Sequence, residues 1–71
     1  MSDRVTPLRR AWRLCHKLAG VYEHEAGRSV TSGARELFAG RAEDMTTARE
    51  CVADALRLTS SWTEADEGED Y

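Results

Sequence analysis

The sequence predicts an all-α protein, a small bundle of about three helices followed by a disordered acidic C-terminal tail. Apolar residues recur at intervals of three and four along three segments, and no segment alternates with the period of two that a strand needs. Residues 59–71 contain five acidic residues and no Lys or Arg. With 71 residues in total, we expect one helical domain over residues 1–62 and the tail over 63–71.

The first helix is expected over about residues 7–26. Thr6 can cap the free backbone N–H groups of the first turn, and Pro7 suits the first helical position because proline has no N–H that needs a partner. Gly27 is expected to end the helix. The apolar face of this helix carries Leu8, Ala11, Trp12, Cys15, Leu18, Ala19 and Tyr22.

A short second helix over about 32–39 and a third over about 45–61 follow. Gly40 is expected to end the second helix, and Thr47 with Glu50 fits the capping box that starts a helix. Trp62 either packs the third helix onto the first or faces a partner. The other residues of the predicted core are Leu14, Cys15, Leu18, Tyr22, Leu37, Phe38, Val52 and Leu56.

The net formal charge of -3 is unevenly distributed along the chain: the N-terminal part is basic and the C-terminal part is acidic. Four cations of the first helix fall within a sector of about 100° opposite its apolar face. Such a surface can bind phosphates or an acidic protein patch, or it can be an ordinary solvated face. Trp12, at the edge of the apolar sector, either contacts the partner or belongs to the core. The predicted partner-binding residues are Arg4, Arg9, Arg10, Trp12, Arg13 and Lys17.

The acidic tail is the second candidate feature. It can imitate nucleic-acid phosphates, enter a basic channel, or fold back over the basic stripe and screen it until a partner competes. A purely solubilising terminus is the alternative. Its acidic residues are Glu64, Asp66, Glu67, Glu69 and Asp70.

No catalytic group of residues is apparent. The serines have no His and acidic residue at the spacing of a catalytic triad, and no phosphate-binding glycine loop occurs. We therefore expect a protein that is not an enzyme and needs no cofactor. Cys15, His16, His24 and Cys51 lack metal-ligand spacing, so we expect no metal site and free thiols. A helix-turn-helix around Gly40 is disfavoured, because its recognition helix would be mixed in sign.

No run of about 18 apolar residues is present, and the first four residues lack the apolar core of a signal peptide. We expect a cytoplasmic protein with no membrane partner. Nine Arg beside a single Lys, with no Ile, Asn or Gln, is typical of a GC-rich coding sequence. This usage points to a GC-rich bacterium or its phage.

By its size, residue usage, helical core, basic end at Arg4, Arg9, Arg10 and Arg13 and acidic stretch Glu64–Asp70, the chain resembles small phage-encoded proteins that take over a bacterial host machine. In particular, it is similar to the small RNA polymerase-binding transcription regulators of xanthomonad phages. The resemblance implies a regulator that docks near the RNA exit channel of host RNA polymerase, inhibits initiation and promotes antitermination. RNA or DNA phosphates could be contacted nearby, and we expect a monomer in a bacterial host cell.

Two alternatives from other classes stay open. One is an inhibitor of a nucleic-acid-binding defence complex, such as an anti-CRISPR protein, in which the acidic tail and third helix carry the affinity by mimicry. The other is a small helical assembly factor that offers its apolar face to a partner helix.

Overall fold

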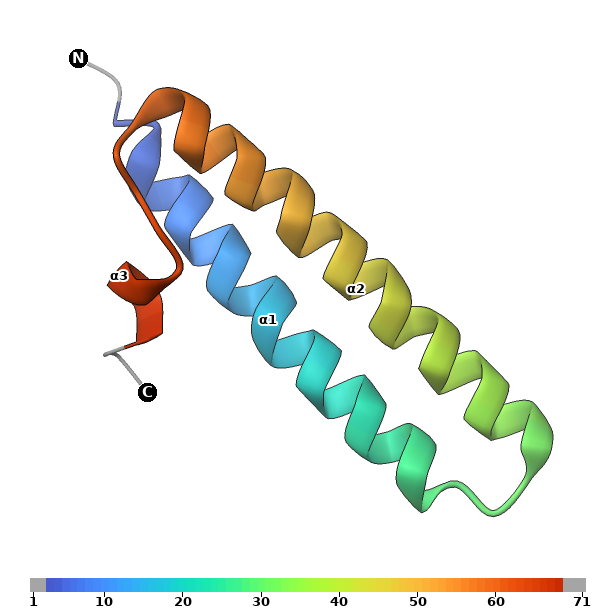
Figure 1. Ribbon diagram of the computed structural model, residues 1–71. Helices are drawn as coiled ribbons and strands as arrows, with labels where there is room; N and C mark the ends of the chain where they lie inside the picture. The colour runs from blue at the N-terminus through green and yellow to red at the C-terminus, as the bar shows by residue number, and fades with distance from the viewer. Residues whose placement is uncertain (1–2, 69–71) are drawn as a thin grey trace.

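The protein is a long antiparallel hairpin of two helices with one further turn of helix folded against it (Figure 1). A computed structural model describes residues 3–68. Helix α1 spans Val5–Arg28, α2 spans Ser32–Thr59 and α3 spans Ala65–Gly68. The hairpin measures 49 × 21 × 17 Å, and its two ends near the termini lie together, opposite the loop that joins α1 to α2. The predicted all-α fold with three helices is confirmed.

The first helix begins two residues earlier than predicted and uses a different cap. The Asp3 carboxylate accepts hydrogen bonds from the backbone N–H groups of Val5 and Thr6, at 3.0 and 3.2 Å. These bonds satisfy two of the donors that every helix N-terminus leaves free. At the other end, Ser29 N–H donates to the carbonyl of Glu25 at 3.0 Å, which closes the last helical turn. The helix therefore ends at Arg28, one residue after Gly27, which was expected to end it.

The predicted break between a second and a third helix is wrong, because residues 32–59 form one continuous helix. Its start is as predicted: Thr31 Oγ1 accepts a hydrogen bond from Ala34 N–H at 3.2 Å. Gly40 does not end the helix, since no glycine among the described residues has positive φ, the conformation that a helix-ending glycine adopts. Burial of Ala42 against α1 supports the helix just beyond Gly40.

Thr47 does not cap a helix start either. Its Oγ1 donates to the carbonyl of Glu43 at 3.1 Å, one turn back within α2. A threonine in a helix interior commonly satisfies its hydroxyl in this way. The capping-box pattern at Thr47 and Glu50 therefore identifies helix-compatible residues without marking a boundary.

The core is narrower than predicted. Leu56 and Trp62 are buried as predicted. The prediction that Leu14 and Leu37 belong to the core is wrong, because these side chains are 57% and 53% exposed. Two helices share a single contact seam, so the wide apolar sector of each helix is only partly covered. The other five predicted core residues are half-buried, namely Cys15, Leu18, Tyr22, Phe38 and Val52. The buried apolar residues within residues 3–68 are Trp12, Ala19, Ala42, Ala53, Leu56 and Trp62.

The first six of the nine predicted tail residues are described, and they turn back toward α1 and end in α3 (Figure 1). Residues 69–71, with Glu69 and Asp70, lie outside the described residues. Within residues 3–68, neither long helix contains a stretch long and apolar enough to cross a membrane.

Continuity of α2 makes Gly40 a test of the fold. A Cβ at Gly40 would meet nothing within 4 Å, so Gly40→Ala should stabilise the protein by about 0.5–1 kcal/mol through helix propensity. For a domain of this size, that corresponds to a rise in melting temperature of about 2–8 °C. Gly20→Ala, in the equally open middle of α1, is the matched control and should give a similar rise. A lower melting temperature for Gly40→Ala alone would show that the chain turns at residue 40.

Candidate binding surface

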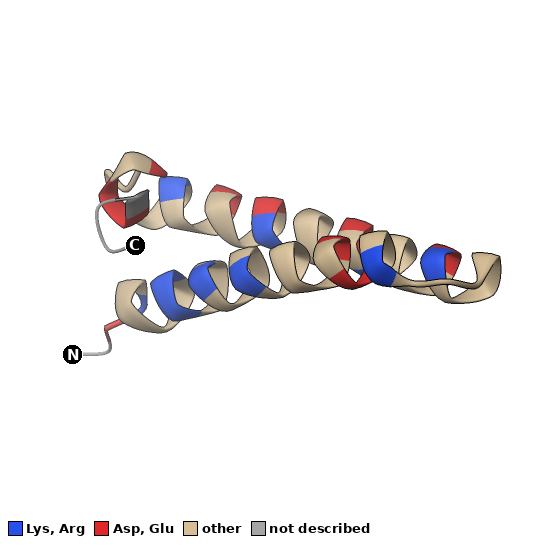
Figure 2. Cartoon of the chain, turned by 90° about the horizontal axis from the view of Figure 1, so that it is seen from below, with Lys and Arg blue, Asp and Glu red and all other residues tan. Residues whose placement is uncertain are grey.

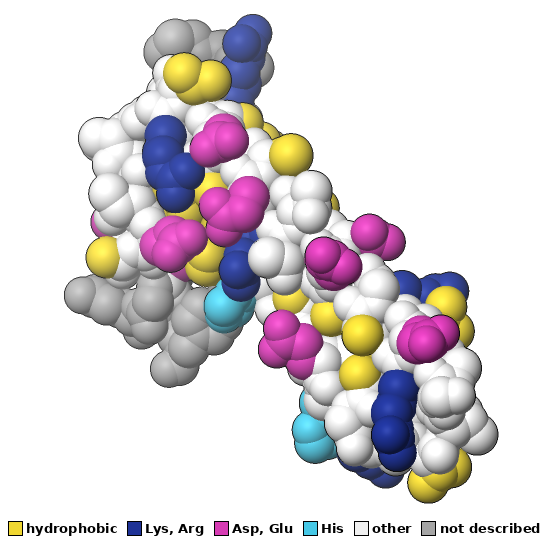
Figure 3. Space-filling model, turned by 45° about the vertical axis from the view of Figure 1, so that its right-hand side comes forward, with side chains coloured by type: hydrophobic (Ala, Val, Ile, Leu, Met, Phe, Trp, Pro, Cys, Tyr) yellow, Lys and Arg dark blue, Asp and Glu magenta, His cyan; other side chains and the backbone are white. Residues whose placement is uncertain are grey.

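The concentrated positive charge of the molecule lies on the first half of α1. Figure 2 shows Lys and Arg there with no acidic residue between them, whereas both signs alternate along α2. The face brought forward in Figure 3 likewise carries acidic and basic side chains interspersed. The basic surface of α1, as we call it, consists of Arg4, Arg9, Arg10, Arg13 and Lys17.

Glu67 of α3 docks on this basic surface. Its carboxylate accepts a hydrogen bond from Arg9 Nε through one oxygen and from Arg13 Nε, at 2.6 Å, through the other. The first oxygen also accepts from the indole Nε1 of Trp62 at 3.2 Å. The side chain of Glu67 is completely buried, while those of Arg9 and Arg13 stay 36% and 41% exposed. One acidic residue of the predicted tail thus occupies part of the predicted binding surface.

Local hydrogen bonds place Glu67 in this position. Ser60 ends α2 by donating its backbone N–H to the carbonyl of Leu56 at 2.9 Å, and its Oγ accepts from Trp62 N–H at 3.2 Å. Thr63 N–H then donates to the Asp66 carboxylate at 2.8 Å, while Asp66 N–H donates to the Thr63 carbonyl. The spacing of Thr63 and Asp66 matches the helix-start pattern of a hydroxyl residue followed three residues later by an acid. That signal was present in the sequence and was missed there.

The environment of Glu67 favours its charged form. Burial by itself raises the pKa of this carboxyl, but the hydrogen bonds from Arg9, Arg13 and Trp62 outweigh burial and hold the pKa at about 2, below its ordinary 4.5. Charge-assisted bonds from two guanidinium groups are among the strongest that a carboxylate can accept. At neutral pH, Glu67 is therefore a charged side chain that is satisfied within its own chain.

Trp12, predicted as either a partner contact or core, lies in the core and is 4% exposed. Its ring packs edge-to-face on Trp62, with centroids 5.6 Å apart, and stacks on His16 at 5.0 Å. Arg49 of α2 hydrogen-bonds His16 Nδ1 at 2.7 Å and lies over the Trp12 ring. His16 and Arg49 were not predicted as neighbours of the site, because a contact between residues 33 apart leaves no periodic signal.

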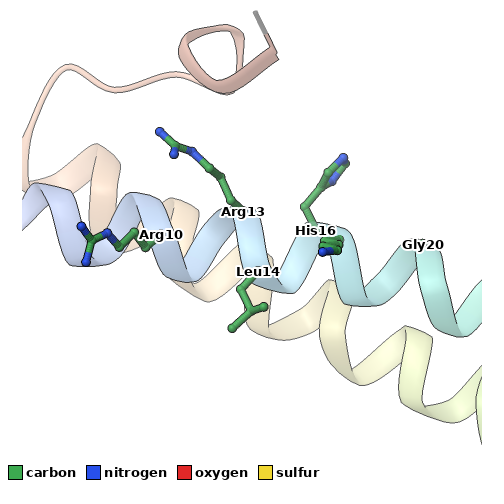
Figure 4. A pocket seen from close by; sticks show the side chains of 6 residues that line it. Arg10, Arg13, Leu14, His16 and Gly20 are labelled. Carbon is green, nitrogen blue, oxygen red and sulfur yellow. The ribbon is translucent and has the colours of Figure 1, made fainter. Parts of the chain in front are cut away.

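Three cations of the basic surface are exposed, namely Arg4, Arg10 and Lys17, and within residues 3–68 no ion pair engages them. Beside them, an open hollow of about 680 Å³ is lined entirely by α1. Figure 4 shows that Arg13 and His16 point to one side of α1, toward the segment that ends in α3, while Leu14 points to the other side. The lining residues are Arg10, Arg13, Leu14, His16, Lys17 and Gly20.

No known protein family matches this chain, and neither does any of the curated proteins or solved structures with which it was compared. Among the residues that the structure describes, no three His, Cys, Asp or Glu side chains gather where they could hold a metal ion. Cys15 and Cys51 are free thiols. The candidate site is therefore characterised by its charge and by its contact with α3.

The pKa of Glu67 sets a pH range in which its contact should be lost. Because the folded pKa of about 2 lies below the ordinary 4.5, the stabilisation is complete above pH 4.5 and decreases as the pH falls toward 2. Tryptophan emission should report this step, since the Glu67 carboxylate bonds the Trp62 indole. Wild-type protein at pH 2 should approach the emission of Glu67→Gln at pH 7, and the variant should lack the step. Glu64→Gln, at an exposed position of the same segment, should retain it. An identical titration in wild type and Glu67→Gln would contradict the described contact.

Proposed function

We propose that this chain is a non-enzymatic regulator that docks on an acidic surface of a protein partner through the basic surface of α1. The observation that carries the proposal is the run of cations from Arg4 to Lys17, uninterrupted by any acid, on a helix whose opposite side is packed against α2. Arginine side chains on a rigid helix are suited to bidentate contact with carboxylates. Phosphates of a nucleic acid held by the partner would be bound by the same groups.

The contact with Glu67 gives this surface a competing ligand from its own chain. A partner carboxylate that binds Arg9 and Arg13 must displace Glu67, or must bind beside it through the exposed cations Arg10 and Lys17. Such competition lowers the apparent affinity of every ligand that needs Arg9 and Arg13 by the same factor, which is set by the fraction of molecules in which Glu67 is displaced. Only a partner that binds tightly enough to displace Glu67 then occupies these two arginines, as the fold-back hypothesis suggested.

Bacterial RNA polymerase is the partner that we propose for this surface. Support comes from the resemblance to phage-encoded polymerase regulators, with the polymerase contacts assigned to the basic surface from its charge and position. In this proposal, docking near the RNA exit channel inhibits promoter-directed initiation and promotes readthrough at terminators. For the acidic-mimicry alternative, Glu67 is unsuitable because it is buried against Arg9 and Arg13, whereas Glu64 and Asp66 are exposed.

A charge-removal experiment tests the docking surface. Arg10→Gln combined with Lys17→Gln should weaken binding to purified bacterial RNA polymerase by about 10-fold or more, as expected for losing two charged contacts. Both residues are exposed, so the circular dichroism spectrum should not change. The control is Arg28→Gln with Arg41→Gln, which removes the same charge from exposed positions near the hairpin loop. Equal affinities for the two double variants would exclude the basic surface as the docking site.

Removing the competing carboxylate should have the opposite effect. Glu67→Gln removes the carboxylate that competes for Arg9 and Arg13, so affinity for polymerase should rise, and inhibition in a purified transcription assay should occur at lower protein concentration. Glu64→Gln removes one negative charge without freeing an arginine and serves as the control. Tighter binding by both variants alike would indicate a nonspecific charge effect. A wild-type protein that changes neither initiation nor termination would reject polymerase as the partner.

A further inference from the structure

A second apolar seam runs along each long helix, outside the seam at which the helices meet. On α1 and on α2, four uncharged residues follow one another at intervals of three, four and three, which is the heptad spacing of packed helices. Four of the eight side chains are exposed, and the others are half-buried. The residues of this outer face, as we call it, are Ala11, Leu14, Leu18 and Val21 on α1 and Ala48, Cys51, Ala55 and Leu58 on α2.

Both seams lie on the same side of the hairpin. His16 and Arg49, which meet across the hairpin through their hydrogen bond, mark one side of it. Leu18 and Cys51 each lie two residues further along, which places them about 160° round their own helices and so on the opposite side. The pairing of His16 with Arg49 also sets the level along the hairpin, and residues 11–21 therefore run beside residues 44–54. The outer face is continuous over the two helices.

The outer face is uncovered in the part of the chain that the structure describes. Helix α3 docks through Arg9 and Arg13, and Figure 4 shows Leu14 pointing away from the side on which Arg13 lies. Leu14, Val21 and Leu58 are 57%, 44% and 88% exposed. Scattered apolar side chains are ordinary on a protein surface, but a contiguous set on two helices marks an interaction site.

The dimensions of the chain also point to a missing layer. Its radius of gyration is 14.3 Å, whereas a compact domain of this length would have about 11 Å. At 1.5 Å per residue, the outer-face residues 11–21 and 48–58 each cover about 15 Å, and together they cover about 20 Å of the 49 Å length of the chain. One further pair of helices would cover the outer face and complete a four-helix bundle.

The outer face is complementary to itself in size and charge. Its α1 seam carries the larger side chains Leu14, Leu18 and Val21, and its α2 seam is mostly small. A twofold axis along the hairpin would lay α1 of one copy over α2 of the other at the same level, with large residues opposite small ones. The same operation brings Arg10, at the margin of α1, toward Asp54, at the margin of α2, whereas Asp44, one heptad before Cys51, continues the line of the α2 seam.

From these observations we propose that the chain forms a homodimer through the outer face, as a four-helix bundle in which α1 of each copy packs on α2 of the other. This differs from the monomer expected from the sequence, and it leaves Glu67 and its arginine partners outside the interface. It does not depend on the identity of the docking partner proposed above.

Sedimentation equilibrium tests the dimer with the full chain. Wild-type protein should show a mass of about twice 8.0 kDa that decreases on dilution. Leu14→Glu and Cys51→Glu, one on each helix and both at exposed positions, should each weaken association by about 30-fold or more while retaining helicity. Val30→Glu, in the loop and 91% exposed, is the control for adding a charge at an apolar position away from the face. A wild-type monomer at all concentrations, or equal weakening by Val30→Glu, would overturn the proposal.

A crosslink tests which helices face each other. In a Cys15→Ala background, Leu14→Cys places a thiol level with the native Cys51 but on the other helix. Mild oxidation with oxidised glutathione should produce a covalent dimer in which position 14 of one copy is joined to Cys51 of the other, as peptide mapping would show. A bond between the two copies of position 14 would overturn the proposed arrangement. Polymerase binding that survives Leu14→Glu but is weakened by Arg10→Gln with Lys17→Gln would separate the two surfaces experimentally.

Discussion

Two antiparallel helices share only one contact seam, and most features of this protein follow from that constraint. Small residues such as Ala19, Ala42 and Ala53 let α1 and α2 approach closely along it. Large buried side chains gather at the end near the termini, where Trp12, Leu56 and Trp62 form one cluster. Each helix therefore keeps most of its circumference outside the seam. What those outer sides carry decides what the molecule can bind.

The contact of Glu67 links this cluster to the basic surface. A buried carboxylate is costly unless its oxygens are well bonded, and here two arginines and an indole supply the donors. The indole belongs to Trp62, whose ring packs on Trp12. Displacing Glu67 from the basic surface would therefore also remove the hydrogen bond that holds Trp62 in the aromatic cluster. In the proposed docking, partner binding and the packing of this end of the hairpin would be coupled through this one side chain.

The molecule separates its two proposed interactions in space. Arg9, Arg13 and α3 lie on one side of α1, and the apolar outer face lies on the other, shared with α2. In the proposed dimer, Arg9 and Arg13 of each copy remain outside the bundle, whereas Arg10 and Lys17 lie at the margin of the interface. Two such surfaces on one particle would strengthen attachment to an extended acidic target by raising the effective concentration of the second contact.

The sequence by itself determined the helical class, the start of α2 at Ser32 and the cluster of cations on α1, because periodicity, local composition and charge are properties of neighbouring residues. It did not determine that α2 continues through Gly40, since a glycine costs only about 1 kcal/mol in a helix and packing of Ala42 can offset that cost. Nor did it determine that Leu14 is exposed while Trp12 is buried, or that Glu67 meets Arg9 and Arg13. Those outcomes depend on the register of the hairpin and on the return of the chain after Trp62. Both join residues that are tens of positions apart, and only the tertiary structure decides such contacts.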